Sequence, residues 1–316
     1  MYIQDILTYY YDFRPFGVRL LDRISGRLTK LPNRCLNGFV KRYIQCNPGR
    51  RYYEHNNSHK RVCDTVVSMT TFPERINYIW LVIESLLRQT ISPIRIVLYL
   101  SKKQFSSEDS IPDSVKRYTD FILDIKMVDD DIRSHKKYWY ALRDYPNKDI
   151  ITVDDDIVYS SDTIATLYKA HQQNPGAIPC MYAHRIYWEN NGCCKPYSQW
   201  DGRIKLNVAS DSIFFGSGGG TYFPQGCLDK ASQNISLIMK HCPTADDIWL
   251  NAITRINGYY PIALRYSHSV PCWTIKNNKR LTDINNGSNQ NDIQLRNVQS
   301  LCEQLFGINP YKKPNC

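Results

Sequence analysis

Residues 149–159 read Asp149-Ile150-Ile151-Thr152-Val153-Asp154-Asp155-Asp156-Ile157-Val158-Tyr159, and this stretch decides the fold. Its first part, residues 150–153, is β-branched and mostly apolar, which is typical of a short strand buried on both faces of a sheet. Three carboxylates follow where the strand would leave the sheet, and open α/β sheets bind ligands at such strand ends. Adjacent anions repel one another unless a hard divalent cation takes oxygen ligands from two or more of them.

Side chains alternate along an extended chain, so Asp154 and Asp156 point to one side while Asp155 faces elsewhere. We therefore predict that Asp154 and Asp156 share one cation. The alternative is that these residues only form a turn or cap a helix. A second triplet, residues 129–131, also follows a strand, but that strand (121–128) alternates apolar with charged residues near its end. This half-exposed pattern favours residues 154–156 as the metal site.

The composition is that of a folded globular protein. The chain has 316 residues, of which 42% are hydrophobic and 22% are charged, and it can form one large α/β domain or two ordinary ones. Its net charge is +10, and residues 1–62 contain twelve basic and four acidic side chains, so they carry eight of these ten charges. The basic character therefore belongs to an N-terminal appendage.

Within this appendage, leucines and isoleucines repeat at helical spacing over residues 16–31, with arginines one position behind them. Residues 14–42 could therefore lie on an anionic membrane surface, or the helix could pack its leucines on the body and solvate its arginines. Residues 47–61 have the composition of a linker. No nucleic-acid partner is expected, and the sequence does not indicate an oligomeric state.

The sequence shows no targeting signal, and together with the cysteine usage this predicts a cytoplasmic protein. The protein would be peripheral on the inner face of the cell membrane if the basic helix binds lipid. There is no run of about 18 apolar residues that would span a membrane. Charges at Asp5, Asp12 and Arg14 interrupt any signal-peptide core. The eleven cysteines are odd in number and contain no CxxC pair, so reduced thiols are expected rather than a disulfide framework or zinc site.

The body alternates strands with helices. Expected strands at 64–69, 94–100, 121–128 and 150–153 are separated by helical segments at 79–89, 107–120 and 134–145, which is the pattern of a parallel sheet with right-handed crossovers. The second half is less regular. It comprises an expected helix at 161–173, an aromatic strand at 177–188, a glycine-rich loop at 216–220, a helix opening near residue 244 and a last helix at 293–306.

Further candidate side chains could contact phosphate or nucleotide. Lys137 lies on the helical segment between the two acidic triplets and could neutralise a substrate phosphate, or it could belong to a solvated helix face. Arg75, in the loop after the first strand, has the same two interpretations. Thr70 and Thr71 could supply hydroxyls to a base or ribose, or cap the next helix.

Asp246 and Asp247 form a second acidic pair, at an expected helix start. A general base needs a carboxylate that is held near an acceptor hydroxyl and away from the metal. Helix capping alone accounts for one of the two acids, and the helix dipole lowers carboxylate pKa values there. His268 is either a third metal ligand or a structural histidine. Walker, GxSxG and HExxH motifs are absent, and the glycines at 216–220 do not match the dinucleotide fingerprint.

Five short motifs now suggest a family. They are Val67 to Ile76, Lys136-Lys137-Tyr138, Ile151 to Tyr159, Gly218 to Pro224, and Ala245 to Leu250. In this order, over roughly residues 64–306, they resemble family 2-like glycosyltransferases of the A-type fold, especially bacterial enzymes of surface-polysaccharide synthesis. The resemblance implies an α/β fold with a single Rossmann-like mixed sheet flanked by helices. It divides the chain into the appendage (1–62), a nucleotide-binding half (63–160) and an acceptor half (161–316).

The resemblance also implies roles for individual residues. Asp154 and Asp156 match the DxD motif, which holds Mn²⁺ or Mg²⁺ on the donor diphosphate. The donor nucleotide is expected to contact Thr70, Thr71, Arg75, Lys137 and Asp155. The acceptor side is expected to include Gly218, Gly219, Gly220 and Trp249. Asp247 matches the catalytic base of inverting members, but the usual Glu-Asp is Asp246-Asp247 here, so the choice between the two stays open.

The expected activity is therefore metal-dependent transfer of a sugar from a nucleotide-sugar donor to a hydroxyl of a glycan or lipid-linked acceptor. The aromatic side chains Tyr182, Tyr187, Trp188 and Trp200 could cover sugar faces. Two alternatives remain open at this point. One is a metal-dependent nucleotidyltransferase, which would release pyrophosphate, and the other is a non-enzymatic basic adaptor for membrane or nucleic acid.

Overall fold

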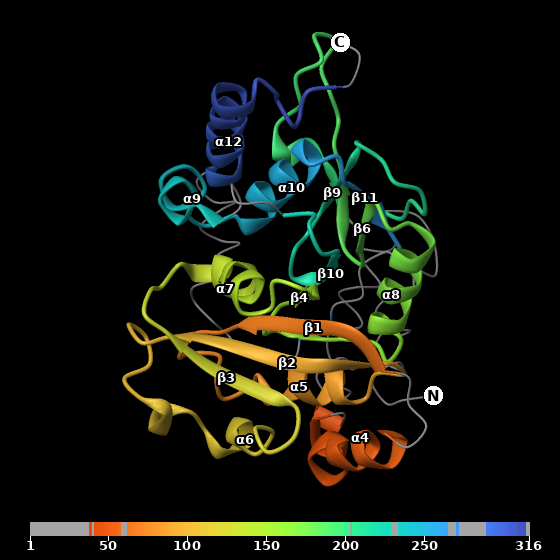
Figure 1. Cartoon of the computed structure of the whole chain (residues 1–316), viewed down its shortest axis with the longest axis vertical. Coiled ribbons are helices and arrows are strands. Elements are labelled where there is room, and N and C mark those ends of the chain that lie inside the picture. Colours follow the sequence, from red (N-terminus) through yellow and green to blue (C-terminus); the bar gives the residue numbers. More distant parts are fainter. Residues whose placement is uncertain are drawn as a thin grey trace.

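The computed structural model describes residues 38–39, 41–57, 62–202, 204–228, 233–264, 270–271 and 289–313. Its centre is a seven-stranded mixed sheet flanked by helices, as the sequence predicts (Figure 1). In spatial order the strands are β11 (Tyr260–Ala263), β6 (Ala177–Cys180), β10 (Gly219–Phe223), β4 (Asp149–Val153), β1 (Val62–Thr70), β2 (Ser92–Ser101) and β3 (Leu123–Val128). Strands β4, β1, β2 and β3 are parallel, whereas β10 runs antiparallel to both β4 and β6.

The strand order reverses beside β1. The chain proceeds from β1 to β2 and β3 on one side, and then places β4 on the other side of β1, with Ser68 opposite both Val97 and Thr152. Ligands bind at the carboxyl ends of strands where the strand order reverses in this way. The loop after β1 and the acidic triplet after β4 therefore lie at the same edge of the sheet.

Helices cover both faces of the parallel strands. Helix α5 (Trp80–Leu87) packs on one face with Val67 and Met69 of β1, and helix α7 (Lys136–Asp144) packs on the other face with Val66. This alternation along β1 produces two apolar cores, one on each side of the sheet. Strand β4 is buried from Ile150 to Val153, as expected for a strand covered on both faces.

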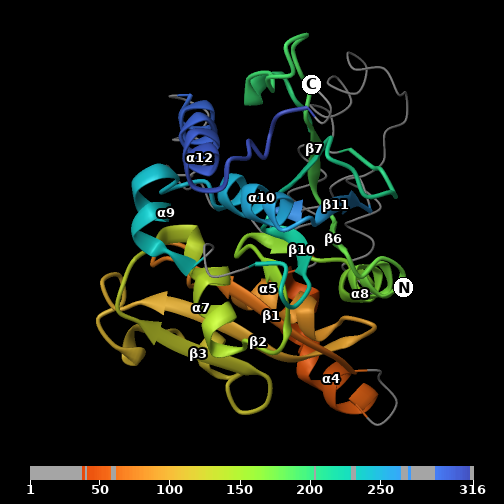
Figure 2. The ribbon, with the colours of Figure 1, turned by 45° about the horizontal axis from the view of Figure 1, so that its top comes forward.

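The second half surrounds the antiparallel part of the sheet. Helix α8 (Thr163–Gln173) packs on β6 and β10, while α9 (Ile235–His241), α10 (Asp246–Ile256) and α12 (Gln290–Phe306) form a group away from β1 to β3 (Figure 2). The smaller pairings are β7 (Ala183–Arg185) between β8 (Asp201–Gly202) and β9 (Ile213–Phe215), and β5 (Ile157–Val158) with β12 (Val270–Pro271). No helix among the described residues has the length and apolar character to span a bilayer.

Three expected elements differ in the structure. The single strand expected at 177–188 is two strands, β6 and β7, which belong to different sheets. Gly219 and Gly220 begin strand β10 rather than ending a loop. Helix α4 (Gly49–Asn57) occupies the expected linker and packs on α5, while α6 (Asp113–Lys116) is the short helix within 107–120. The amphipathic segment at 16–31 lies outside the described residues, and the boundary at residue 62 stays a prediction.

A buried ion pair at the end of α5 also binds the first residue of α4. Arg88 Nη1 lies 2.5 Å from Glu84 Oε2, which also accepts a 2.6 Å hydrogen bond from Gly49 N, and both side chains are almost fully buried. Because Arg88→Ala leaves the buried Glu84 carboxylate with only the half-exposed Arg117, whose Nη2 lies 3.6 Å from Glu84 Oε1, we expect the free energy of unfolding to fall by about 3 kcal/mol in chemical denaturation. Arg50→Ala, which breaks an exposed pair with Glu54, is the control and should have little effect. Equal losses in the two variants would contradict this account.

Candidate functional site

The middle residue of the acidic triplet ties two loops together. Asp155 is buried, and it accepts hydrogen bonds of 2.5 Å from both Thr71 Oγ1 and Arg75 Nη1. Arg75 Nη1 also lies 2.9 Å from Asp156 Oδ2. The hydroxyl of Thr70 donates to the carbonyl of Tyr99 at 2.8 Å. Asp155 thus fixes the loop after β1 against the end of β4.

The two outer carboxylates are of the kind that binds divalent cations. The side chains of Asp154 and Asp156 are 44% and 35% exposed, and both are hard oxygen ligands. Burial and the charges of Asp154 and Asp155 raise the pKa of Asp156 to about 6, so negative charge is concentrated here and only partly neutralised. Within the described residues, no group of three or more His, Cys, Asp or Glu side chains is placed to hold an ion. His268 lies outside the described residues.

The competing triplet has a different environment. Asp129 and Asp130 are 84% and 64% exposed and pair with Lys102 at 2.7 Å and Lys103 at 2.9 Å. Asp131 pairs with Lys136 Nζ at 2.5 Å. Each carboxylate of residues 129–131 therefore has its own lysine, which leaves no shared negative charge for a cation to neutralise.

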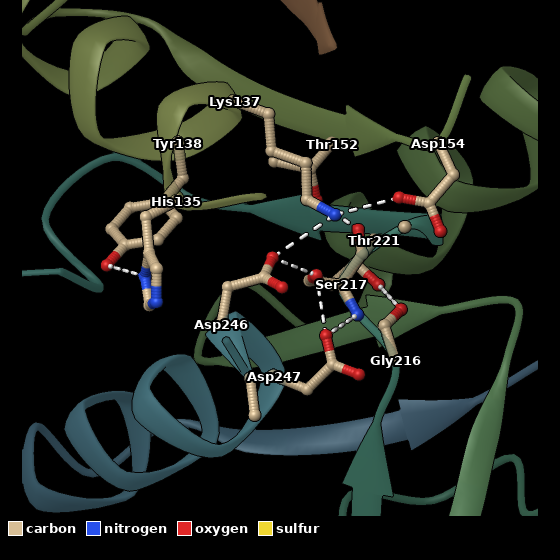
Figure 3. A network of polar contacts seen from close by, with 12 residues as sticks. His135, Lys137, Tyr138, Thr152, Asp154, Gly216, Ser217, Thr221, Asp246 and Asp247 are labelled. Atoms are coloured by element: carbon tan, nitrogen blue, oxygen red, sulfur yellow. Dashed lines mark hydrogen bonds and ion pairs between the residues drawn. The ribbon is translucent and has the colours of Figure 1, made fainter. Parts of the chain in front are cut away.

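Lys137 connects the two acidic regions that the sequence singles out. Its side chain is only 3% exposed, and its Nζ lies 2.9 Å from Asp154 Oδ1 and 3.1 Å from Asp246 Oδ2 (Figure 3). Ser68 Oγ donates to the carbonyl of Lys137 at 2.5 Å and so anchors the first turn of α7 on β1. Burial would lower the pKa of Lys137, but the charges of Asp154, Asp246 and Asp247 raise it above its usual value. Lys137 is thus a permanent buried cation, not part of a solvated helix face.

The two acids at the start of α10 have different proton affinities. Burial favours the neutral form of Asp246, but the charge of Lys137 outweighs burial and lowers the pKa of Asp246 to about 2. Asp247 is half-buried, and burial together with the negative charge of Asp246 raises its pKa to about 7. A carboxylate whose pKa is near neutrality suits a general base at physiological pH. Of the two, Asp247 has the environment of a base.

Residues 216–218, between β9 and β10, contact both the end of β4 and the two acids of α10. Gly218 O accepts hydrogen bonds from Asp154 N at 2.9 Å and from Tyr159 OH at 2.5 Å, and Thr152 Oγ1 donates to Ser217 O. A Cβ atom added at Gly218 would lie 1.8 Å from Asp154 Cγ, so any other residue here requires the Asp154 side chain to move. Gly218 therefore lies against the expected metal site and not only on the acceptor side.

The remaining predicted residues are placed as follows. A Cβ added at Gly219 would meet the Tyr182 side chain at 2.4 Å, which puts Tyr182 beside the same segment. Gly220 has a φ of +97° within β10 and packs near Met181. Trp249 is 1% exposed and lies in the apolar core, so the structure does not place it on an acceptor surface.

Two residues of the site were not singled out in the sequence. Ser217 contacts both Asp246 and Asp247, and the only signal for it is its place inside a run of glycines. His135 is fully buried, with Nδ1 2.9 Å from Tyr138 OH and Nε2 2.8 Å from Cys242 O. It is near enough to Asp246 to influence the pKa of that acid, and no sequence signal distinguishes it from an ordinary helix residue.

Comparisons with known proteins give distant likenesses only. No family model and no curated protein matches the chain. A mannosyltransferase from Pyrobaculum calidifontis, solved with GDP-Man and Mn²⁺, has a TM-score of 0.41 at 16% identity, over 69% of this chain and 62% of its own. TarS of S. aureus, solved with UDP-GlcNAc, has a TM-score of 0.44 at 13% identity, over 70% and 61%.

A 4-diphosphocytidyl-2C-methyl-D-erythritol synthase has a TM-score of 0.42 at 10% identity, over 69% of this chain and 94% of its own. The chain spans about three fifths of the length of the mannosyltransferase and TarS structures, at 62% and 61%. At such scores these likenesses carry no argument about the reaction.

Proposed function

We propose that this protein is a metal-dependent glycosyltransferase that moves a sugar from a nucleotide-sugar donor to a hydroxyl of a glycan or lipid-linked acceptor. The observation that carries the proposal is the position of Lys137. Its buried ammonium touches Asp154 on one side and Asp246 on the other, next to Asp247. A leaving-group site and a base are thereby held together, as transfer to a hydroxyl requires.

Asp154 and Asp156 would hold Mn²⁺ or Mg²⁺, which when bound supplies positive charge for the departing diphosphate. Lys137 adds a fixed positive charge beside the same site. Asp247 takes the proton from the acceptor hydroxyl, whose oxygen forms the bond to the anomeric carbon as the bond from that carbon to the diphosphate oxygen breaks. A single displacement of this kind inverts the anomeric configuration. Asp246 stays ionised and holds Lys137 in place.

On the donor side, Thr70, Thr71 and Arg75 lie at the end of β1, where the strand order reverses. Tyr182, beside Gly216 and Gly219, offers an aromatic face for an acceptor sugar. We also place the activity in surface-polysaccharide synthesis, with the protein cytoplasmic and attached peripherally to the membrane by residues 14–42. The experiment for this last point compares membrane partition with and without residues 1–37.

The reaction is tested with a panel of UDP-, GDP- and dTDP-sugars, with and without Mn²⁺, by following release of nucleoside diphosphate. We expect release only with metal, and its loss on addition of a chelator. Release of pyrophosphate from a nucleoside triphosphate, in place of this reaction, would identify a nucleotidyltransferase. Absence of both reactions across the panels would favour the non-enzymatic adaptor.

Removing the metal ligands gives a matched comparison between the two triplets. We expect Asp154→Ala and Asp156→Ala each to lower turnover by about 100-fold or more, because metal stabilisation of a leaving group contributes several kcal/mol. Asp129→Ala and Asp130→Ala are the controls, since these exposed carboxylates pair with surface lysines. Full turnover in the Asp154 and Asp156 variants would show that the metal site is elsewhere.

A further inference from the structure

The side chain of Ser217 lies between the two acids of α10. Its Oγ is 2.5 Å from Asp246 Oδ2 and 2.7 Å from Asp247 Oδ1, and its backbone N–H donates to Asp247 Oδ1 at 3.0 Å (Figure 3). Ser217 is fully buried. Both hydroxyl contacts have the length of good hydrogen bonds. The second oxygen of Asp247 points away from Ser217 (Figure 3).

A serine hydroxyl has one proton to donate. If Asp246 and Asp247 were both ionised, only one of the two contacts could be a hydrogen bond, and the other would place an oxygen lone pair against a carboxylate oxygen. Both contacts are satisfied when one of the acids carries a proton and donates it to Ser217 Oγ. Asp246 has the Lys137 ammonium at 3.1 Å, which favours its ionised form. The proton therefore belongs to Asp247.

The other titratable groups facing this pair do not replace that proton. Burial lowers the pKa of His135 to about 4, so its ring is neutral near pH 7. Burial raises the pKa values of Tyr138 and Tyr197, with further contributions from Asp246 and Asp247 respectively, and burial also raises the pKa of Cys242. These three groups therefore stay neutral and protonated. Lys137, which lies among Asp154, Asp246 and Asp247, is the charged neighbour that remains.

We propose that Ser217 is the positioning residue of the base, donating its hydroxyl proton to Asp246 and accepting the proton of Asp247, so that the resting protein stores one proton on Asp247. The inference rests on the proposed function in that Asp247 becomes the base for the acceptor hydroxyl after losing this proton. Asp246, Ser217 and Asp247 then form one unit in which two carboxylates share a single added proton. This resembles other carboxylate pairs in which the charge of one member raises the pKa of the other.

The arrangement predicts the direction of a pKa change. The protonated pair has two hydrogen bonds through Ser217 Oγ, whereas the fully ionised pair has only one. Ser217→Ala removes two hydrogen bonds from the protonated pair and one from the ionised pair. The midpoint of Asp247 titration should therefore fall, by about 0.5 to 1 pH unit for the net loss of one hydrogen bond. A hydroxyl that merely donated to an ionised Asp247 would have the opposite effect, because its removal would raise the midpoint.

The first experiment uses the full chain labelled with aspartate carrying ¹³C in its side-chain carboxyl. Carboxyl carbon shifts are followed against pH and assigned with Asp246→Asn and Asp247→Asn. In the parent protein we expect Asp247 to titrate near neutral pH and Asp246 to stay ionised from pH 4 to 9. Two carboxylates that are both ionised at pH 6 would overturn the proposal, without any variant at Ser217.

The second experiment compares variants by the same titration and by the pH dependence of turnover. Ser217→Ala should lower the midpoint, and Ser217→Thr, which keeps the hydroxyl, should restore it. Thr221→Val is the matched control, because it removes a fully buried hydroxyl of the neighbouring strand that donates to Gly216 O at 2.9 Å, away from both acids. An unchanged or raised midpoint in Ser217→Ala would overturn the proposal. Since the titration needs no substrate, its result stands apart from the presence or absence of transferase activity.

Discussion

Asp247→Asn is expected to lower turnover by about 10²- to 10⁴-fold, the range that general base catalysis contributes, with little change in donor binding. Asparagine keeps the shape of the side chain and can still bond with Ser217, but it cannot accept the proton of the acceptor hydroxyl. Steady-state rates with saturating nucleotide-sugar measure the effect. If Asp247→Asn retained most of its turnover, the base would have to be another group.

The pH dependence of turnover should separate Asp247→Asn from a variant of its neighbour, Asp246→Asn. The active form of Asp247 is ionised, and its pKa is raised to about 7, so turnover of the parent should fall tenfold per pH unit below about pH 7 and level off above it. Asp246→Asn removes the neighbouring negative charge, so it should move this midpoint to lower pH. Asp247→Asn removes the titrating group, so its residual turnover should lack this midpoint. The two variants are therefore distinguished by their pH profiles as well as by their rates.

Stability supplies an independent readout of Asp247. Because the folded pKa lies above the value of an unfolded aspartate, the folded state binds more protons than the unfolded state between about pH 4 and 7, and stability falls as the pH rises through this range. Asp247→Asn removes this dependence, so the variant should melt at a higher temperature than the parent at pH 8. Loss of activity together with gained stability would mark Asp247 as a functional residue rather than a structural one.

Local pattern was enough to predict the strand and acids at the centre of the molecule. The β-branched residues before Asp154 have no alternation, and the structure buries them between α5 and α7 as β4. The roles of Asp155 and Lys137 depend on partners distant in sequence. Asp155 is 80 residues from Arg75, and no periodicity reports a contact of that kind. Such contacts follow only from the strand order.

The second half was harder to predict because its elements are short and irregular. Gly219 and Gly220 suggest a loop, yet Gly219 pairs with Val153 of β4, and Gly220 is the extra residue at a register shift between Gly219 and Thr221. Trp249 was misread for a geometric reason. It follows Asp247 by two residues, and about 100° per residue places it on nearly the opposite side of α10, in the core. Proximity in sequence to a candidate base does not imply proximity in space.

Gly218→Ala should nearly abolish turnover, because the added methyl group and the Asp154 carboxylate would occupy the same space. The new Cβ would lie 1.8 Å from Asp154 Cγ and 1.9 Å from each carboxylate oxygen. The backbone has little freedom to retreat, since Gly218 O accepts from Asp154 N and Tyr159 OH. Asp154 must therefore rotate away from the expected metal position, and we expect a loss of about 100-fold or more, as for removal of the carboxylate itself.

Measuring turnover against Mn²⁺ concentration tests this displacement, because a misplaced ligand should raise the concentration that is needed. Gly176→Ala is the matched control, since nothing lies within 4 Å of an added Cβ there, and it should keep parental turnover. Combining Gly218→Ala with Asp154→Ala should add little to either single change, because both remove the same ligand. A folded Gly218→Ala protein with parental turnover, or a fully additive double variant, would mean that Asp154 does not act at the position where Gly218 lies against it.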